Sequence, residues 1–271
     1  MNSSGKKLLK NNNWSTWSMK IENILCLLPL LALSSCVLSE DLSPPVDGKA
    51  VNIAVVKPAD IDILPMDVIY RSETCRDKVF TSTGAITTRA GYHRLTVPFN
   101  PEKGSNIVSN NIALDGGGQC EWKISNIRFQ FKFSKMDRFG INIKKNIPND
   151  IVFMFDDNQP PRGNGHKDNV MGDVLIIKDY YALINDKFTD DGFDVLHIEG
   201  QPLLTYRVYN VRNIIFKPNV HSDIVVNVLT PQKKEDDYII LYPNGERVAD
   251  HLFPFSDKTR YEFVRQKTIK K

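Results

Sequence analysis

Histidines are the side chains best able to act as acid, base or metal ligand near neutral pH, and their spacing in this chain forms no recognised site. None of the five stands within four positions of another, so the spacings common in zinc sites are absent. Residues 36–271 also contain no G-x-S-x-G, S-x-x-K, Walker-loop or H-E-x-x-H motif. We therefore predict no catalytic residue, no metal site and no cofactor, and expect that the protein is not an enzyme. The histidines are His93, His166, His197, His221 and His251.

Cys36 ends an apolar run, and this pattern indicates export. The run Ile24–Leu33 has about half of the roughly 20 residues that a membrane-spanning helix needs, and it matches the apolar core of a secretory signal peptide. Its end, Leu33-Ser34-Ser35-Cys36, resembles the bacterial lipobox, in which the cysteine is lipidated and becomes the first residue of the mature protein. The resemblance implies a signal peptide over residues 1–35 and acylation, palmitate included, at Cys36. The alternative is a chance cysteine in an ordinary signal peptide.

Two further features of the leader bear on translation and sorting. Residues 1–18 are polar and lack apolar periodicity, so we expect translation to start at Met19, with a long basic leading region as the alternative. In the enteric sorting pattern an aspartate after the lipidated cysteine retains a lipoprotein in the inner membrane. Here that position is Val37. The resemblance therefore implies a lipid anchor in the outer membrane, facing the periplasm.

Cys75 and Cys120 are the two cysteines left after the leader and the lipidated residue, and we predict that they form a disulfide. An oxidising periplasm favours their pairing. The bond would close a loop of about 45 residues and restrict the unfolded chain by roughly 4 kcal/mol on the entropic model. The alternative is two separately buried thiols.

The longest polar interruption in the chain is residues 156–169, which we interpret as a recognition loop for another macromolecule. Asp156, Asp157, Arg162 and His166 combine charge and hydrogen-bonding capacity with an adaptable backbone and are the candidate partner-binding residues. An ordinary disordered loop is the alternative. The acidic side chains here lack the spacing of a calcium loop and are typical of turns. The glycine-rich stretch Asp115–Cys120 has no following helix and is interpreted as a flexible turn beside the disulfide.

Period-two alternation is the main structural signal. In residues 126–133, Ile127, Phe129, Phe131 and Phe133 fall on one face of a strand while charged or amide side chains fall on the other. Weaker strands recur at short spacing, and Asn244-Gly245 predicts a hairpin turn. The pattern predicts an all-β fold, an antiparallel β-sandwich or barrel-like domain. Residues 259–271 fit either a short C-terminal helix or a frayed strand. The further predicted strands are residues 51–56, 67–72, 93–99, 119–124, 141–147, 150–155, 173–181, 193–199, 203–211, 213–218, 223–229 and 237–248.

We expect residues 36–49 to be a lipidated tether and residues 50–271 to be one periplasmic β-rich domain, with a split at the polar loop as the alternative. The chain carries 35 basic and 32 acidic residues, but residues 1–35 hold four lysines and one glutamate. Residues 36–271 are therefore formally neutral. A neutral chain lacks the positive field that drives nucleic-acid binding, so we expect no nucleic-acid partner.

Two short motifs carry a family resemblance. Tyr70–Cys75 and Gly116–Ile124, which contain both cysteines and Trp122, resemble motifs of lipoproteins associated with type VI secretion effector loci. Some of these are immunity proteins that block phospholipase toxins in the periplasm. The resemblance implies that the protein neutralises a toxic effector by stoichiometric binding, with loops of a β scaffold inserted into the toxin. The alternatives are a structural lipoprotein of an envelope or secretion assembly, and an enzyme that gathers His93 or His221 with carboxylates in a pocket.

Overall fold

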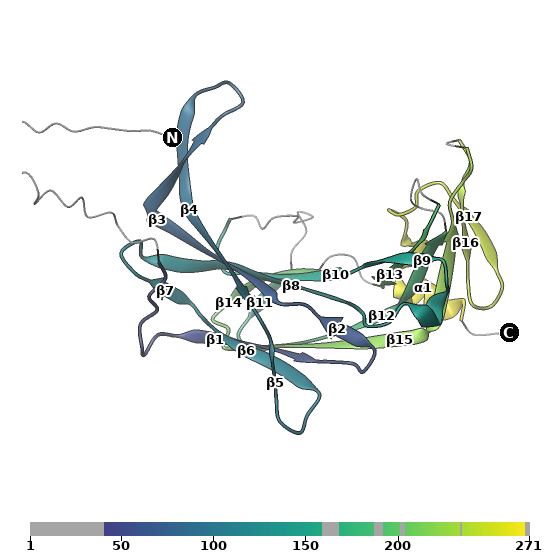
Figure 1. Cartoon of the computed structure of the whole chain (residues 1–271), viewed down its shortest axis with the longest axis horizontal. Coiled ribbons are helices and arrows are strands. Elements are labelled where there is room, and N and C mark those ends of the chain that lie inside the picture. The colour runs from purple at the N-terminus through teal and green to yellow at the C-terminus, as the bar shows by residue number, and fades with distance from the viewer. Residues whose placement is uncertain (1–40, 159–167, 187–191, 201–203, 234, 269–271) are drawn as a thin grey trace, which may run out of the picture. The chain divides into compact units, whose positions relative to one another are not determined.

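A computed structural model describes residues 41–158, 168–186, 192–200, 204–233 and 235–268, all within one compact unit, Ser39–Lys271. Most of the regular structure among the described residues is β-strand (Figure 1). The predicted all-β, sandwich-like fold is confirmed. The strands are β1 Ala50–Val56, β2 Ile61–Ile63, β3 Met66–Phe80, β4 Ile86–Val97, β5 Asn100–Pro101, β6 Ile107–Ala113, β7 Asp115–Gly117, β8 Trp122–Phe133, β9 Ile143–Ile147, β10 Asn149–Met154, β11 Asp168–Met171, β12 Val174–Asp186, β13 Asp194–Glu199, β14 Leu204–Tyr209, β15 Asn213–Leu229, β16 Tyr238–Leu241 and β17 Arg247–Asp250.

Two sheets contain these strands. One runs β5-β6-β1-β15-β12-β13-β9, with β16 beside β15 and β17 beside β16. The other runs β11-β14-β10-β8-β3-β4, with β2 and β7 beside β8. Both sheets are mixed rather than wholly antiparallel, because β1 and β12 each pair in parallel with β15, and β10 and β11 each pair in parallel with β14. The partners in these pairs are mostly distant in the sequence. Local turn signals therefore could not indicate whether these paired strands run parallel or antiparallel.

The main core lies between the two sheets and is rich in aromatic side chains. β8 shows the predicted alternation, since Ile127, Phe129, Phe131 and Phe133 are at most 1% exposed. Phe131 lies edge-on to Tyr180 of β12, with ring centroids 4.9 Å apart. Offset and edge-to-face pairs of this kind add to the hydrophobic stabilisation that burial provides. The strongest pattern in the sequence thus supplies the centre of the core.

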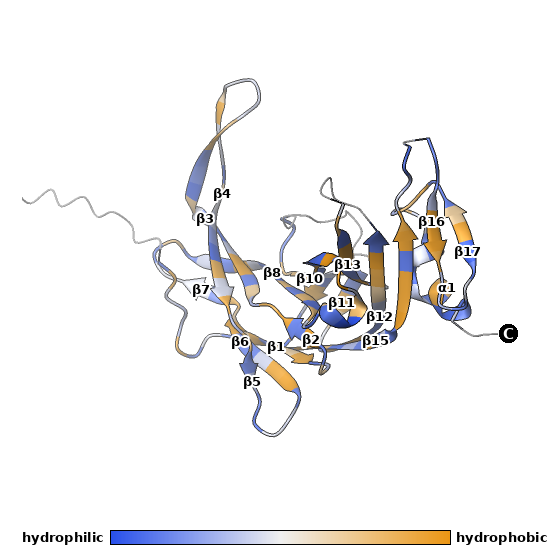
Figure 2. Ribbon diagram, turned by 45° about the vertical axis from the view of Figure 1, so that its right-hand side comes forward, coloured by the Kyte–Doolittle hydropathy of each residue, from blue (hydrophilic) through white to orange (hydrophobic). Residues whose placement is uncertain are grey.

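A second, smaller core lies on the opposite face of β12 and β15. Tyr181 and Leu183 of β12 alternate with side chains that point into the main core, so these strands serve both cores. The β16–β17 hairpin covers this core and turns at Gly245, whose φ of 86° is suited to glycine, as the Asn-Gly signal predicts. Helix α1, Tyr261–Gln266, completes it. Figure 2 shows the hydrophobic stretches of β15 and β16 at this end. Residues 259–271 therefore include the short helix rather than a strand.

The β3–β4 hairpin is longer than the sheet that contains it. β3 pairs with β8 only from Asp67 to Arg71, and its outer residues, Arg76–Phe80, pair only with β4. The outer part of the hairpin extends away from the sheets (Figure 1). A disulfide joins Cys75, at the start of this part, to Cys120 before β8, with 5.2 Å between the Cα atoms. The predicted pairing is present.

Part of the expected tether contacts the domain. The Ser43 amide donates to the Gly116 carbonyl (2.8 Å), and Leu42 packs against the main core. Trp122 lies within 3.3 Å of the position that a Cβ at Gly91 would take, next to the disulfide. The N-terminal chain therefore packs against the glycine run that we predicted as a flexible turn.

No helix among the described residues is long and apolar enough to cross a membrane.

Candidate functional site

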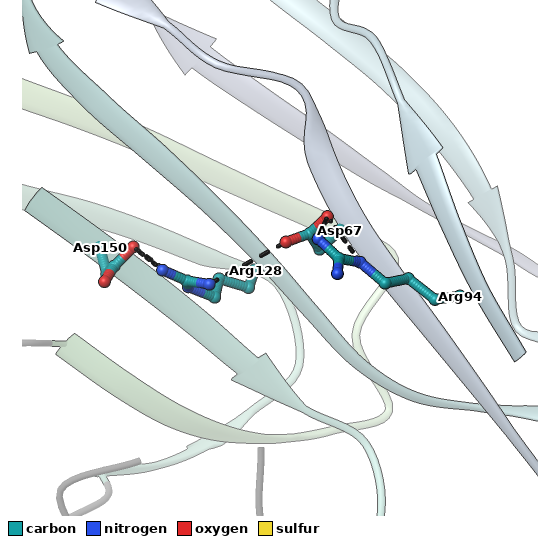
Figure 3. Close-up of polar contacts among 4 residues, drawn as sticks. All are labelled: Asp67, Arg94, Arg128 and Asp150. Atoms are coloured by element: carbon teal, nitrogen blue, oxygen red, sulfur yellow. Dashed lines mark hydrogen bonds and ion pairs between the residues drawn. The ribbon is translucent and has the colours of Figure 1, made fainter. Parts of the chain in front are cut away.

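A ladder of alternating charges crosses the outer face of the eight-stranded sheet (Figure 3). Asp67 of β3 accepts from Arg94 of β4 at 2.6 and 3.0 Å. Its other carboxylate oxygen lies 4.0 Å from Arg128 of β8. Arg128 in turn donates to Asp150 of β10 at 2.8 and 3.1 Å. Four neighbouring strands thus present charges of alternating sign in one row.

The strand register explains this row. Asp67 and Arg128 are direct cross-strand partners, and the neighbouring positions on their strands, such as Val68 and Ile127, point into the core. Side-chain exposure falls from 54% at Arg94 to 14% at Arg128. The inner charges are therefore shielded from water, where ion pairs and charge-assisted hydrogen bonds are stronger. The hydrogen bonds that Arg94 donates to the Asp67 carboxylate, together with its negative charge, raise the pKa of Arg94.

Two arginines on the same face stack on tyrosines. The Arg71 guanidinium lies 4.8 Å from the ring centroid of Tyr92, and that of Arg207 lies 5.3 Å from Tyr209. We call these four residues, together with Asp67, Arg94, Arg128 and Asp150, the charged face. Arginine and tyrosine are the residue types most enriched at the energetic centres of protein interfaces. The composition of the charged face suits recognition of a protein.

Several buried polar atoms of this face have unused hydrogen-bonding capacity. Within the described part of the chain, Nε of Arg71, Oδ1 of Asn126, Oγ1 of Thr205 and Nε and Nη1 of Arg207 have no hydrogen-bond partner. Asn126 of β8 and Arg207 of β14 are both direct partners of Met154 on β10, and Arg71 lies on β3, the next strand after β8. These residues therefore lie on neighbouring strands of one sheet. An unsatisfied buried polar group destabilises the fold by about 1–3 kcal/mol. Such groups are expected where binding is favoured over stability.

The structure describes two of the four predicted loop residues. Asp157 is 96% exposed and its carboxylate lies 3.2 Å from Nη2 of Arg207, which connects the loop to the charged face. Asp156 instead accepts from the backbone and side chain of Asn158, as the turn interpretation predicts. Arg162 and His166 lie outside the described residues, as does Cys36. The strands on either side of the loop, β10 and β11, both pair with β14 and so belong to one sheet.

The ladder was not predicted from the sequence. Its signal was present in the polar alternate positions of β3 and β8, such as Asp67 and Arg128, but we interpreted those of β8 only as the polar face of a half-buried strand and assigned no role to Asp67. Polar alternation occurs on every half-exposed strand, and register decides which charges meet. The pairing of β4 with β3, of β3 with β8 and of β8 with β10 brings the four residues into one row.

The histidines occupy separate places in the described chain. His93 packs on Trp122, with ring centroids 5.4 Å apart. His197 contacts Asn185, and its pKa is lowered to about 4 by burial and, less strongly, by Lys145. His221 lies 2.8 Å from Asp179 and stacks on Tyr261. No group of three or more potential metal ligands forms among the described residues.

A cavity of about 880 Å³ opens at one end of the space between the sheets. Leu114, Ile124 and Phe155 form its apolar part, and Lys49, Tyr209 and Arg212 line it as well. The lining residues that the structure describes include no histidine and no carboxylate. Tyr209 belongs to both the cavity and the charged face, so the two features are contiguous.

Comparisons of this chain with protein-family models, with curated proteins and with solved structures found no match.

Proposed function

We propose that this protein is a lipid-anchored periplasmic binding protein that neutralises a toxic effector by stoichiometric binding through its charged face. The observation that carries the proposal is the four-strand charge ladder flanked by two arginine–tyrosine stacks. The lipobox-like leader and the two cysteine motifs support the anchor and the immunity role. The protein would act by occupying the toxin, so it requires no reacting group of its own.

The charge pattern suits selective binding. Alternating charges on a rigid sheet favour a partner whose own charges follow the complementary order, and they disfavour partners whose charges are out of register. Loops of the toxin or of this chain would add contacts at the edge of the charged face, where Asp157 lies close to Arg207.

A structural lipoprotein of an envelope or secretion assembly is the second candidate. The observation that favours it is the position of β4, which lies at the edge of the eight-stranded sheet and has twelve residues. A long edge strand carries backbone groups that can pair with a strand of another protein. A structural role would be accompanied by a stable complex of several subunits.

A contact-dependent competition assay tests the first candidate. A mutant that lacks the gene is grown in dense contact with its otherwise identical parent, and we expect selective killing of the mutant. Expression of the gene in the mutant should rescue it. Survival of the mutant, under conditions in which the parent kills another strain, would count against immunity and favour the structural role.

Two matched variants test whether rescue in this assay depends on the charged face. Tyr92→Ala with Arg94→Ala removes an exposed aromatic and the outer arginine of the ladder, and should abolish rescue. Leu252→Ala with Arg260→Ala removes an apolar side chain and an arginine elsewhere and should rescue fully. Leu252 is 56% exposed against 36% for Tyr92, and the Arg260 side chain is 55% exposed against 54% for Arg94. Equal thermal unfolding of the two variants would exclude misfolding. Full rescue by the first variant would place the binding surface elsewhere.

A further inference from the structure

The outer end of the β3–β4 hairpin exposes two large apolar side chains next to each other. Phe80 is 79% exposed, Ile86 is 66% exposed, and the two are direct cross-strand partners. Lys78 and Thr88, the next pair on the same face, are also exposed. At a lipid interface, proteins typically place apolar side chains toward the acyl chains and a lysine nearer the water. The tip of this hairpin has the same arrangement, with the apolar pair outermost and Lys78 behind it.

The arm is fixed firmly at its base. The disulfide joins Cys75 to Cys120, and Ser72 Oγ accepts from the Cys75 amide while it donates to the Cys120 carbonyl. Gly91 of β4 fits closely against the Cys75 carbonyl and Trp122. These contacts hold the direction of the hairpin relative to β8. The tip of the hairpin therefore keeps a fixed direction relative to the rest of the domain.

The same base is where the N-terminal chain reaches the domain. Ser43 bonds to Gly116 in β7, next to the segment that holds Cys120. Cys36 lies five positions before Asp41, a span of at most about 18 Å when extended. Phe80 likewise lies five positions after Cys75, which at about 3.3 Å per residue in a strand extends about 17 Å. A lipid at Cys36 and the tip of the arm can thus reach one membrane surface.

The charges of the arm agree with such a surface. Arg76 pairs with Glu73, and Arg89 lies 3.5 Å from Asp77, so these four charges balance. Lys78 remains as a net positive charge beside the apolar pair. A bilayer that contains anionic lipids attracts this charge while the two apolar side chains enter the headgroup region.

We propose that the tip of the β3–β4 hairpin is a second membrane contact, in which Phe80 and Ile86 enter the headgroup region of the bilayer beside the lipid anchor. This inference rests on the proposed anchor at Cys36. With two points of contact, the domain would keep a fixed orientation on the membrane. The charged face would then be presented in a constant direction to a partner that acts at the same membrane.

Fluorescence of the processed, lipidated protein (residues 36–271), purified from the membranes of expressing cells and reconstituted into vesicles, tests this contact. The vesicles contain phosphatidylethanolamine and phosphatidylglycerol, with and without bromine on the upper acyl chain. Phe80→Trp should add emission that shifts to the blue and is quenched by the brominated lipid. Leu175→Trp, at a residue of β12 that is 58% exposed, is the matched control and should stay unquenched. Signals are taken relative to the parent, which contains Trp122.

Vesicle flotation separates failure of the contact from failure of the anchor. Flotation with equal, low quenching of the Phe80→Trp and Leu175→Trp variants would overturn the hairpin contact and leave the anchor intact. A blue shift without quenching would mean that Phe80 packs on protein, which also overturns it. Protein that does not float would overturn both proposals. Quenching restricted to the Phe80→Trp variant would support the second contact.

Discussion

The carbonyl oxygen of Ser43 approaches Gly117 so closely that a Cβ at Gly117 would lie 2.2 Å from it. Gly117 also has a φ of 56°, a conformation that residues with a side chain rarely adopt. Gly118 is similar, since a Cβ there would lie 2.6 Å from the Asp41 carbonyl oxygen. The glycine run therefore allows the N-terminal chain to lie against β7.

Gly117→Ala should destabilise the domain for this reason. Both the contact with Ser43 and the left-handed conformation oppose the new methyl group, and we expect a loss of at least about 2 kcal/mol in the free energy of unfolding. Chemical denaturation measures it. Gly84→Ala is the control, because its φ is 81° but no atom lies within 4 Å of the Cβ position. It should lose only about 1 kcal/mol. Equal losses would mean that the Ser43 contact is unimportant.

Replacing Cys75 by Ser tests the disulfide to Cys120. The sequence separation of 45 residues predicts a loss of about 4 kcal/mol on the entropic model. Denaturation under oxidising conditions should show this loss, and denaturation of both proteins in excess reductant should show nearly none. An equal difference between the two proteins under both conditions would mean that the effect comes from packing rather than from the bond.

The sequence was most informative where a local pattern determined the outcome. The alternation around Phe129 and Phe131 predicted β8, Asn244-Gly245 predicted the β16–β17 turn, and the count of cysteines predicted their pairing. Each of these features depends on neighbouring residues or on composition. The mixed direction of the sheets and the charge ladder depend on which distant strands pair, and period two alone does not encode that choice.

Glu199 should make stability fall as the pH rises. Burial raises its pKa to about 7 from an ordinary value of 4.5, although the Gly200 amide donates to it. Between about pH 4.5 and 7 the unfolded chain has lost this proton while the folded protein retains it, so unfolding becomes easier with increasing pH. His197 has the opposite effect between about pH 4 and 6.5, because its lowered pKa makes the folded state bind less proton.

Glu199→Gln separates the two groups, since glutamine keeps an oxygen to accept from Gly200. We expect the variant to match the parent near pH 4.5 and to exceed it above pH 7 by up to about 3 kcal/mol. With the Glu199 contribution removed, the variant should gain stability from about pH 4 to 6.5 because of His197. Denaturation series across pH measure both trends. A constant difference between the two proteins at every pH would mean that Glu199 titrates normally in the fold.

The two ends of the ladder should differ in coupling energy. Double-mutant cycles with alanine at Arg128 and Asp150 should give about 1–2 kcal/mol, because both side chains are at most 18% exposed and share two hydrogen bonds. The cycle for Arg94 and Asp67 should give less than about 1 kcal/mol, since Arg94 is largely exposed. Raising the salt concentration should weaken mainly the outer pair. Equal coupling in the two cycles would contradict the shielding of the inner charges.

Cys36→Ala tests the anchor on which both proposals depend. One acyl chain holds a protein only marginally, whereas two or more hold it stably, so loss of the lipidated residue should move the protein from the membrane to the soluble fraction. Alkaline washing of isolated membranes followed by immunodetection measures this. A Cys26→Ala variant is the matched control, because Cys26 lies within the expected signal peptide and should leave the distribution unchanged. If the Cys36→Ala protein stays with alkali-washed membranes, the lipid is not the anchor. Under our proposal, a released protein would be diluted through the periplasm and would protect less than the parent protein does against an effector that acts at the membrane.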